Sequence, residues 1–478
     1  MTVGRFAERA WNDLGASAGD PGGIGCENPP VRLDSRLDVA ELVTDSIGMA
    51  SAVIEQVAAL RGRREPRPLR LRGDLITTSV TSERHFRLDD QLPRAWAPLS
   101  GFWPARDGWV RTHANYPHHE QRLRLLLGLD DAAGVETFAA AVAERGAVEL
   151  EDIAAEKGAI VVAVRDRQTW ACHPHAAAVA DTPLIRRETV GAARARRWPG
   201  GCSLPLSGLR VLDMTRVIAG PVATRDLAYA GADVLRVDSP RLPEIDWQHL
   251  DTGQGKRSTT LDLASRVDRR VLTDLLATAD VVVTGYRPGA LDRYGLSPDQ
   301  LAEDYPGLVI GSVSAWGREG PWRSRRGFDS IVQAATGIAM VESPDGARPG
   351  ALPAQALDHS AGHFLAAAIA RSLVEQASDG ATVHVSVSLC RLAHELLETT
   401  GTTVPGPRDA GTAEPVAPPT TQTVTSDAGR VTFAAPAISV PDAPGRYSAA
   451  ASRWGGDAAA WASRTSQRGA RMNGARAR

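Results

Sequence analysis

The segment Val211-Leu-Asp-Met-Thr-Arg-Val-Ile-Ala-Gly-Pro-Val-Ala-Thr224 decides the fold of this chain. Its short apolar start is typical of a buried strand, and the Gly220-Pro221 pair that follows suits the first turn of a helix. A second apolar run, Ala232-Asp-Val-Leu-Arg-Val-Asp238, comes after a helical stretch at 224–230. A strand, a helix and another strand in this order predict a unit with two parallel strands and a right-handed crossover.

The same alternation continues toward the C-terminus. Apolar runs predict further strands over residues 280–284, 308–313 and 381–389, and helical periodicity is found over 271–277, 298–303 and 360–376. Strands that alternate with helices at this spacing predict an α/β protein with a Rossmann-like parallel sheet. We therefore expect a large domain over residues 201–400.

The regions before and after residues 201–400 differ from that domain in composition and periodicity. Residues 1–30 are rich in glycine and small residues and predict a flexible lead-in, whereas residues 31–200 show mainly helical periodicity and predict a smaller α+β domain. The proline-rich stretch 402–425 indicates a linker. Beyond Asp457 there are five arginines and no acid, so residues 401–478 are expected to be a linker followed by a basic tail.

Composition excludes several classes of protein. The 478 residues include 54 Lys and Arg against 56 Asp and Glu, which gives a net charge of −2 and no global field that favours nucleic acid or an anionic membrane. No apolar run reaches the ~18 residues of a membrane span, and the N-terminus lacks the apolar core of a secretory signal. A cytoplasmic protein without a membrane or nucleic-acid partner is expected.

Cysteine and histidine do not indicate a metal site. The four cysteines, at positions 26, 172, 202 and 390, show no C-x-x-C spacing. Two histidine groups are present, one at 113, 118 and 119 and one at 173 and 175. Their spacing fits no ligand template, and Pro117 and Pro174 predict turns. We expect structural histidines and no bound metal.

The first strand–helix turn could hold an anion. Gly220-Pro221 opens a helix, where free N–H groups attract negative charge, and Asp238 ends the next strand where a dinucleotide fold keeps its ribose acid. However, G-x-G-x-x-G is absent and Pro221 lacks an N–H donor, so an NAD site is disfavoured. A tight turn without a ligand and a site for a different nucleotide-bearing ligand both stay open.

Basic residues follow successive strands of the predicted sheet. They are Lys256, Arg257, Arg287, Arg293, Arg323, Arg325 and Arg326. Ligands of open parallel sheets bind beyond the carboxyl ends of the strands, and arginine there forms paired hydrogen bonds with phosphate. Each residue alone is typical of a solvated surface charge, but their shared position predicts an anion site.

Asp358 stands immediately before the long apolar helix at 360–376. Aspartate is favoured as the capping residue of a helix, where it contributes ~1 kcal/mol. A carboxylate at such a position could instead act as a nucleophile toward a carbonyl carbon. The local sequence does not choose between these two roles.

Residues 204–395, about 40% of the chain, resemble the class III CoA-transferases, a family that includes formyl-CoA transferase, carnitine CoA-transferase and the α-methylacyl-CoA racemases. The resemblance rests on ordered blocks, which are Pro205–Thr215, Ala219–Thr224, Gly231–Asp238, Gly255–Leu263, Ala279–Leu296 and Phe328–Gly337. A looser similarity to the family's small domain covers Asp107–His113, Leu125–Gly128 and Trp170–Pro174, which here precede the large domain instead of following it.

The resemblance implies a coenzyme A site across the strand ends. Its lining residues would be Ile218, Ala219, Ser239, Leu261, Asp262, Leu263, Ala264, Gly285, Tyr286, Arg287, Arg293, Arg326, Gly327, Phe328 and Asp329. Arg293 and Arg326 occupy positions suited to the CoA phosphates. Ser239 and Gly285 stand where relatives often have Arg and usually have Asn, so two donors are missing.

The resemblance also assigns Asp358 as the catalytic nucleophile of an acyl-CoA:carboxylate CoA-transferase. CoA would be a substrate passed through an aspartyl-CoA thioester, with no permanently bound cofactor. The substrates would be an acyl-CoA and a carboxylic acid, and the family's interlocked protomers imply a homodimer.

Two alternatives remain. Racemases of this fold use the His of a Gly-His-Asp segment, which reads Gly327-Phe328-Asp329 here, and this favours transfer over racemisation. His359 and His363 are near Asp358 in the sequence and could replace that base. The substituted positions of the CoA site also fit a catalytically silent CoA-binding subunit.

Overall fold

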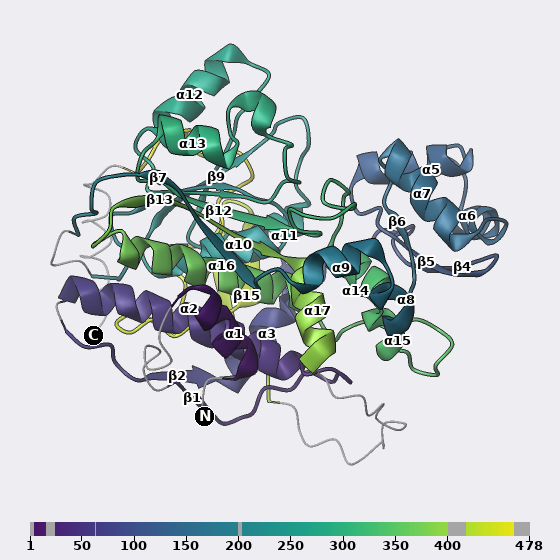
Figure 1. The fold of residues 1–478 in the computed structure, drawn as a ribbon, viewed down its shortest axis with the longest axis horizontal. Coiled ribbons are helices and arrows are strands. Elements are labelled where there is room, and N and C mark those ends of the chain that lie inside the picture. Colours follow the sequence, from purple (N-terminus) through teal and green to yellow (C-terminus); the bar gives the residue numbers. More distant parts are fainter. Residues whose placement is uncertain (1–3, 16–23, 63, 199–202, 400–416, 463–478) are drawn as a thin grey trace.

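A mostly parallel seven-stranded sheet forms the centre of the chain (Figure 1). The computed structural model describes residues 4–15, 24–62, 64–198, 203–399 and 417–462. In sheet order the strands are β10 (Arg257–Thr260), β9 (Asp233–Asp238), β8 (Arg210–Met214), β11 (Val281–Thr284), β12 (Val309–Ser314), β13 (Ala381–Ser388) and β7 (Ile185–Ala192). The first six are parallel and β7 is antiparallel to β13. The expected α/β fold with a parallel sheet is confirmed.

Both faces of this sheet are buried, which explains its continuous apolar runs. Val211 of β8 and Val281 of β11 face one core, whereas Leu212 and Val282, the next residues, face another. The second face is covered by α12 (Arg266–Leu276) and α13 (Pro298–Asp304). The first face is covered by α10 (Ala219–Tyr229) and α16 (Ala356–Glu375), as Figure 1 shows.

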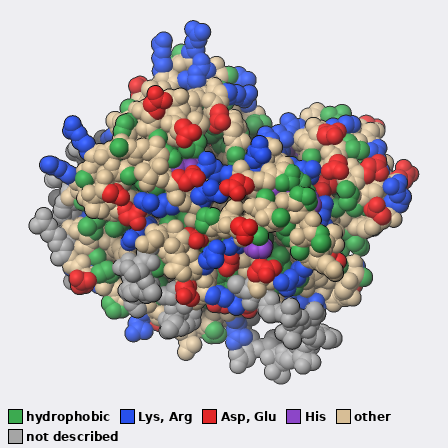
Figure 2. All heavy atoms as spheres, viewed as in Figure 1, with side chains coloured by type: hydrophobic (Ala, Val, Ile, Leu, Met, Phe, Trp, Pro, Cys, Tyr) green, Lys and Arg blue, Asp and Glu red, His purple; other side chains and the backbone are tan. Residues whose placement is uncertain are grey.

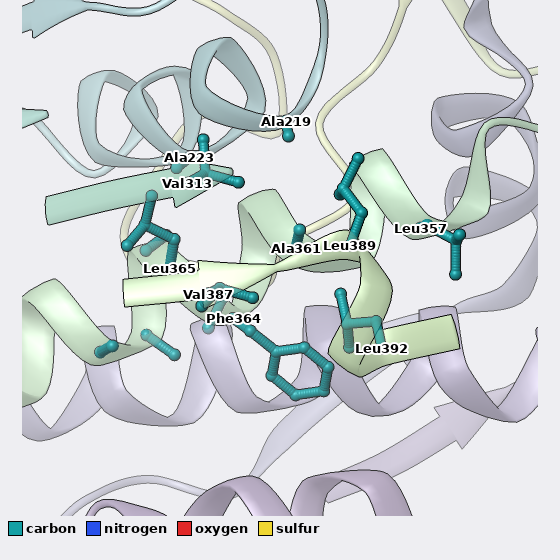
Figure 3. Packing of buried hydrophobic residues seen from close by; sticks show 14 of the residues in the cluster. Ala219, Ala223, Val313, Leu357, Ala361, Phe364, Leu365, Val387, Leu389 and Leu392 are labelled. Atoms are coloured by element: carbon teal, nitrogen blue, oxygen red, sulfur yellow. The ribbon is translucent and has the colours of Figure 1, made fainter. Parts of the chain in front are cut away.

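Helix α16 is buried along nearly its whole length. It lies between the sheet and α2 (Val39–Gly62), and α1 (Arg5–Asp13) packs against α2. Figure 3 shows Ala361, Phe364 and Leu365 of α16 among apolar side chains of α10, β12, β13 and α17 (Leu389–Thr399). Because most residues of α16 are buried, packing against the neighbouring elements fixes the position of the helix.

A glycine sets the approach of α16 to α10. A Cβ atom at Gly362 would lie 2.5 Å from the carbonyl oxygen of Ala219 and 2.8 Å from Val222. Any side chain at this position would push the two helices apart. Because α10 and α16 both begin at the same edge of the sheet, their separation controls the geometry of that edge.

A smaller α+β unit has its own core, at the right of Figure 1. Its antiparallel sheet and helices are β4 (Phe102–Ala105), β5 (Gly108–Thr112), β6 (Val161–Ala163), α5 (Pro117–Leu127), α6 (Val135–Ala143) and α7 (Ala147–Lys157). Leu123, Phe138 and Leu150 pack against one another in this core. The small unit is thus built from residues 99–163.

The packing differs from the expected domain boundaries in three places. Helix α1 lies within the expected flexible lead-in of residues 1–30. Helix α2 and strand β7, expected in a small domain over 31–200, join the core of the large sheet because their apolar faces are buried there. Strands β14 (Thr421–Ser426) and β15 (Gly429–Ala434) pair with each other and with β3 (Arg87–Leu88), so this part of 401–478 is not a linker. Residues 400–416 and 463–478 lie outside the described residues.

The remaining elements are short and connect these layers. They are β1 (Ile24–Glu27), β2 (Leu69–Arg72), α3 (Gly73–Val80), α4 (Ser82–His85), α8 (Arg167–Ala171), α9 (Pro174–Ala180), α11 (Asp246–Thr252), the 3-10 helix η1 (Asp292–Tyr294), α14 (Asp329–Thr336) and α15 (Ile338–Val341). Among the helices of the described ranges, none is long and apolar enough to cross a membrane. Figure 2 shows acidic and basic side chains interspersed over the visible face.

Substitution Gly362→Val should destabilise the fold. The new side chain would meet the backbone of Ala219, which cannot move away without disturbing the sheet. We expect the free energy of unfolding to fall by about 1–3 kcal/mol, the usual cost of overpacking, measured by urea denaturation. Gly134→Ala is the control, because a Cβ there has no neighbour within 4 Å. Equal stability of the two variants would contradict this packing.

Candidate active site

A cleft of about 550 Å³ opens beyond the carboxyl ends of β8, β9, β11 and β12. The chain leaves β8 toward β9 on one side and later enters β11 on the other side, so the cleft lies at the point where the strand order reverses. Open α/β sheets bind ligands at such points. The far wall of the cleft comes from the small unit, through Tyr116, His118 and His119.

Most residues expected in the CoA site line this one cleft. They are Ala219, Ser239, Asp262, Leu263, Ala264, Gly285, Tyr286, Arg287, Arg293, Arg326, Gly327, Phe328 and Asp358. Three others do not line it. Ile218 is the residue before α10, Leu261 is buried in the core under α12, and Asp329 lies fully buried beside Asp358.

The structure adds lining residues that the sequence did not indicate. Arg216 and Arg241 line the cleft, but Arg216 pairs with Glu244 at 3.5 Å and Arg241 pairs with Asp262 at 2.7 Å. The hydroxyl of Tyr116 donates to Glu244, which ties the small unit to the large sheet. No local signal in the sequence could have placed Tyr116 in this cleft, because Tyr116 comes more than 90 residues before β8, the first strand of the cleft in the sequence.

Three arginines give the cleft its positive charge. In the part of the chain that the structure describes, Arg287, Arg293 and Arg326 have no acidic partner. The guanidinium groups of Arg287 and Arg326 donate to backbone carbonyls, those of Ser324 at 2.7 Å and Gly158 at 3.3 Å. Burial, together with nearby arginines, lowers the pKa of Arg326 to about 10. Such uncompensated cations favour the binding of phosphates.

Other basic residues of the predicted anion site have structural roles instead. The buried ammonium of Lys256 donates to Asp213 at 3.1 Å and to Thr224 at 2.6 Å, and burial lowers its pKa to about 8. Arg257 pairs with Asp233 at 2.7 Å. The side chains of Arg325 and Arg323 also lie outside the cleft, with Arg325 3.3 Å from Asp152. Lys256, Arg257 and Arg325 are thus paired with neighbouring acids, which sequence spacing could not reveal.

Asp358 lies in the first turn of α16 and opens on the cleft. The residue that precedes the helix is Gln355, so the capping role considered for Asp358 is wrong. Its side chain is 6% exposed, and no described residue donates a hydrogen bond to its carboxyl group. A carboxyl group that no donor holds in place is available for chemistry with a ligand.

Asp329 is the partner of Asp358. Its carboxylate accepts the backbone N–H of Asp358 at 3.0 Å and the side-chain amide of Gln333. Burial raises the pKa of Asp329 to about 6 although these donors oppose the change. Burial and the nearby charge of Asp329 raise the pKa of Asp358 well above its usual value. Both shifts favour the protonated form of the pair, and the shift of Asp358 has the additional contribution from the charge of Asp329.

The histidines of the small unit form an aromatic wall. The rings of His113 and Phe328 stack with 3.7 Å between their centroids, and His119 meets Phe328 edge-on at 5.8 Å. Burial lowers the pKa of His113 to about 3 and that of His119 to about 2, so both rings are neutral. Within the described ranges no group of three or more His, Cys, Asp or Glu is placed to hold a metal ion.

His359 and His363, considered as replacement bases, lie away from the cleft. Both are 1% exposed, and neither contributes to its lining. The Nδ1 atom of His363 lies 2.6 Å from Asp226, and burial holds the pKa of His359 well below its usual value. The structure thus offers neither ring to a ligand in the cleft.

Comparison with known proteins agrees with this geometry. The sequence profile of CoA-transferase family III matches residues 206–439, a region that contains the whole parallel part of the sheet and Asp358. The match covers just under half of the chain, and these residues are similar to CoA-transferase family III. The family region continues past residue 400 to include β14 and β15, in agreement with their packing.

Several characterised proteins are similar to this family III region. A probable fatty acyl-CoA transferase of Mycobacterium tuberculosis is 34% identical over 203 residues, which are 40% of this chain and 51% of that protein. A formyl-CoA:oxalate CoA-transferase of Streptomyces coelicolor is 33% identical over 205 residues, 39% of this chain and 50% of that protein. The chain thus spans about half the length of these relatives.

A solved structure covers the same part of the chain. The crystal structure of a CAIB/BAIF family protein from Brucella suis is 28% identical, with a TM-score of 0.37, over 41% of this chain and 55% of that one.

The buried carboxyl pair should lower stability at neutral pH. A folded-state pKa above the unfolded value means that the folded chain binds protons more tightly than the unfolded chain. The free energy of unfolding is therefore highest below about pH 4. It falls as the pH rises through about 6, where Asp329 titrates. Asp358→Asn removes an acidic group whose charged form is disfavoured by burial and by the charge of Asp329. We expect its free energy of unfolding at pH 7 to exceed that of the wild type by about 1–3 kcal/mol.

Denaturant titrations at pH 4 and pH 7 measure this difference, which should vanish at pH 4. Asp131→Asn, at an exposed position, is the control and should change stability at neither pH. An Asp358→Asn variant that is less stable than the wild type at pH 7 would show that the pair is not under electrostatic strain.

Proposed function

We propose that this chain transfers coenzyme A between an acyl-CoA and a carboxylic acid, with Asp358 as the nucleophile. The observation that carries the proposal is that the free carboxyl group of Asp358 opens on the same cleft as the unpaired Arg287, Arg293 and Arg326. The activity of the relatives, which act on acyl-CoA and on formyl-CoA and oxalate, supports the same chemistry.

The arginines fit the nucleotide end of coenzyme A. Its diphosphate and 3′-phosphate carry several negative charges, and three guanidinium groups without acidic partners can compensate them. The side chains of Tyr286 and Leu263 supply apolar surface to the same cleft. A cleft of about 550 Å³ lies within the usual size range of small-molecule sites.

The chemistry exchanges a thioester bond without consuming water. The Asp358 carboxylate attacks the acyl carbonyl and expels the CoA thiolate, which leaves a mixed anhydride. The thiolate then attacks the aspartyl carbonyl, releases the first acid and forms an aspartyl-CoA thioester. The second acid attacks this thioester to form a new anhydride, and the thiolate attacks its acyl carbon to release the new acyl-CoA and free Asp358.

Asp329 supports this role of Asp358. Because burial and mutual repulsion favour protonation of the pair, a proton on Asp358 must pass to Asp329 or leave the cleft before Asp358 can act as a nucleophile. The backbone N–H of Asp358 already donates to Asp329, which keeps the two groups together. A dry and enclosed carboxylate is also a stronger nucleophile than a hydrated one, and an enclosed anhydride is protected from hydrolysis.

Removal of the nucleophile should abolish transfer. We expect Asp358→Ala to lower kcat by at least ~10³-fold, because no described neighbour offers a second free carboxylate to the cleft. Incubation of the wild type with acyl-CoA, followed by hydroxylamine and peptide mass spectrometry, should place the adduct on Asp358. Asp131→Asn is the control variant. Transfer that survives Asp358→Ala would overturn the assignment.

The arginines should act on the nucleotide and not on the thioester. For Arg326→Gln we expect a KM for acyl-CoA at least ~10-fold higher, the scale of a lost charged hydrogen bond. The KM for the matching acyl-pantetheine, which lacks the phosphates, should not change. Steady-state kinetics with both substrates measure this. An equal effect on both substrates would show that Arg326 does not bind phosphate.

The same assays distinguish CoA transfer from two alternatives, a racemase or isomerase and a catalytically silent CoA-binding subunit. A racemase or isomerase would exchange the α-proton of an acyl-CoA in deuterium oxide without an acceptor acid, but His359 and His363, considered as its base, lie outside the cleft. A silent subunit would bind CoA and form no hydroxylamine-sensitive adduct. Neither alternative is favoured by a contact in the cleft.

The resemblance to the family also implies a homodimer. We retain this as a prediction about the assembled protein, and sedimentation equilibrium tests it: a particle of twice the 50.7 kDa chain is expected, and a monomer would contradict it.

A further inference from the structure

A second cavity, of about 600 Å³, lies on the other side of α14 from the CoA cleft. Its walls come from the small unit, from α14 and from the segment that leads into α16. They include Trp96, Phe102, Arg111, Ser330, Gln333 and Leu352. Neither the proposed CoA site nor Asp358 contributes to this cavity.

Arg111 is the unusual group in this cavity. Its side chain is 7% exposed, and its guanidinium carbon lies 4.8 Å from the ring centroid of Trp96 and 4.9 Å from that of Phe102. Throughout the described ranges it has no acidic partner and no hydrogen-bond acceptor, and its buried Nε atom is unsatisfied. Burial lowers the pKa of Arg111 to about 10, so it remains charged at neutral pH.

An unpaired buried charge is expensive, and two aromatic faces compensate only part of that cost. The two rings lie close to the guanidinium carbon, and the N–H groups of Arg111 have no acceptor among the described residues, so an anion in the cavity could accept from them. The hydroxyl of Ser330, another lining residue of this cavity, is also buried without a hydrogen-bond partner. A cation and a hydroxyl that both lack partners in one cavity indicate a ligand with acceptor oxygens.

Glu83 also lines the cavity, but burial raises its pKa to about 7, so below that pH its carboxyl group is mostly neutral and the charge of Arg111 favours a carboxylate ligand. Arg111 is the only lining cation of the cavity without a hydrogen-bond acceptor among described residues, since Arg84 donates to the carbonyl of Pro353. A single planar guanidinium matches one carboxylate through paired hydrogen bonds, whereas a phosphate needs more donors. Leu92, Trp96 and Leu352 supply apolar surface for the body of the ligand.

Two lining residues of the cavity, Gln333 and Gln355, also connect it to the Asp329–Asp358 carboxyl pair. The side-chain amide of Gln333 donates to Asp329, and its oxygen accepts the N–H of Leu352 at 2.9 Å. Gln355, the residue before α16, lines the cavity and is one helical turn away from Asp358. A ligand that moves either wall would therefore change the surroundings of the carboxyl pair.

We propose that this cavity is a second binding site, for a small organic acid with an apolar body whose carboxylate pairs with Arg111. The ligand is either the acid that accepts CoA or an effector of the same chemistry. The site itself does not depend on the proposed transfer activity, because the contacts that define it lie outside the CoA cleft.

Calorimetric titration with benzoate tests the site directly. We expect the wild-type chain to bind benzoate at least ~10-fold more tightly than neutral benzamide, and Arg111→Gln to bind benzoate at least ~10-fold more weakly. Arg106→Gln, at an exposed arginine of the same unit, and Arg326→Gln, in the CoA cleft, are the matched controls and should bind as the wild type does. If Arg111→Gln does not fold, Ser330→Ala should still weaken binding several-fold.

Absence of benzoate binding, equal binding of benzoate and benzamide, or unchanged binding by Arg111→Gln would overturn the proposal. A loss of binding in Arg326→Gln equal to that in Arg111→Gln would also overturn it, by placing benzoate in the CoA cleft.

Kinetics then distinguish the two sources of the ligand. If the ligand is the acceptor, Arg111→Gln raises the KM for the acid and leaves the KM for acyl-CoA unchanged. If it is an effector, benzoate alters transfer to another acid without being consumed. A chain that binds benzoate through Arg111 but transfers no CoA would contradict the proposed function and leave this site in place.

Discussion

Two carboxyl groups, Asp358 and Asp329, are buried together at the beginning of α16, and the rest of the candidate site depends on their repulsion. Burial alone raises the pKa of both, and the charge of Asp329 raises that of Asp358 further. Without a ligand the pair lowers its energy by keeping a proton. In the proposed function, Asp358 becomes a nucleophile once that proton has moved.

The position of α16 makes this burial possible. The helix is covered by the sheet, α10, α2 and α17, and Gly362 lets it approach Ala219 at the start of α10. The first turns of α10 and α16 therefore meet at the edge of the sheet where the strands end. The small unit closes the cleft from the other side through Tyr116, His118 and His119. Residues before 200 thus complete a site whose chemistry comes from residues after 200.

The sequence predicted the central sheet well because parallel strands buried on both faces have continuous apolar runs, such as Val281-Val-Val-Thr284. The family resemblance indicated most of the cleft residues. The argument from strand ends correctly placed Arg287, Arg293 and Arg326 at one edge of the sheet, but not the other basic residues that it named. It was wrong about long-range packing. Nothing local in β7 shows that it pairs with β13, and nothing in β14 and β15 shows that they reach β3.

The sequence also did not predict which basic residues are paired with acids and which face the cleft. Lys256 and Arg293 look alike in the sequence, but Lys256 is buried beside Asp213 whereas Arg293 faces the cleft. The same holds for Arg111, which alternation along a strand cannot distinguish from a solvated residue. Only the positions of Trp96 and Phe102 show that its charge is enclosed.

The most direct test of the account is a crystal structure of the chain with coenzyme A. We predict that the phosphates lie against Arg293 and Arg326 and that the thiol sulfur lies about 3–4 Å from the Asp358 carboxyl group, close enough for attack. Coenzyme A bound elsewhere, or a sulfur atom directed away from Asp358 into solvent, would contradict the account.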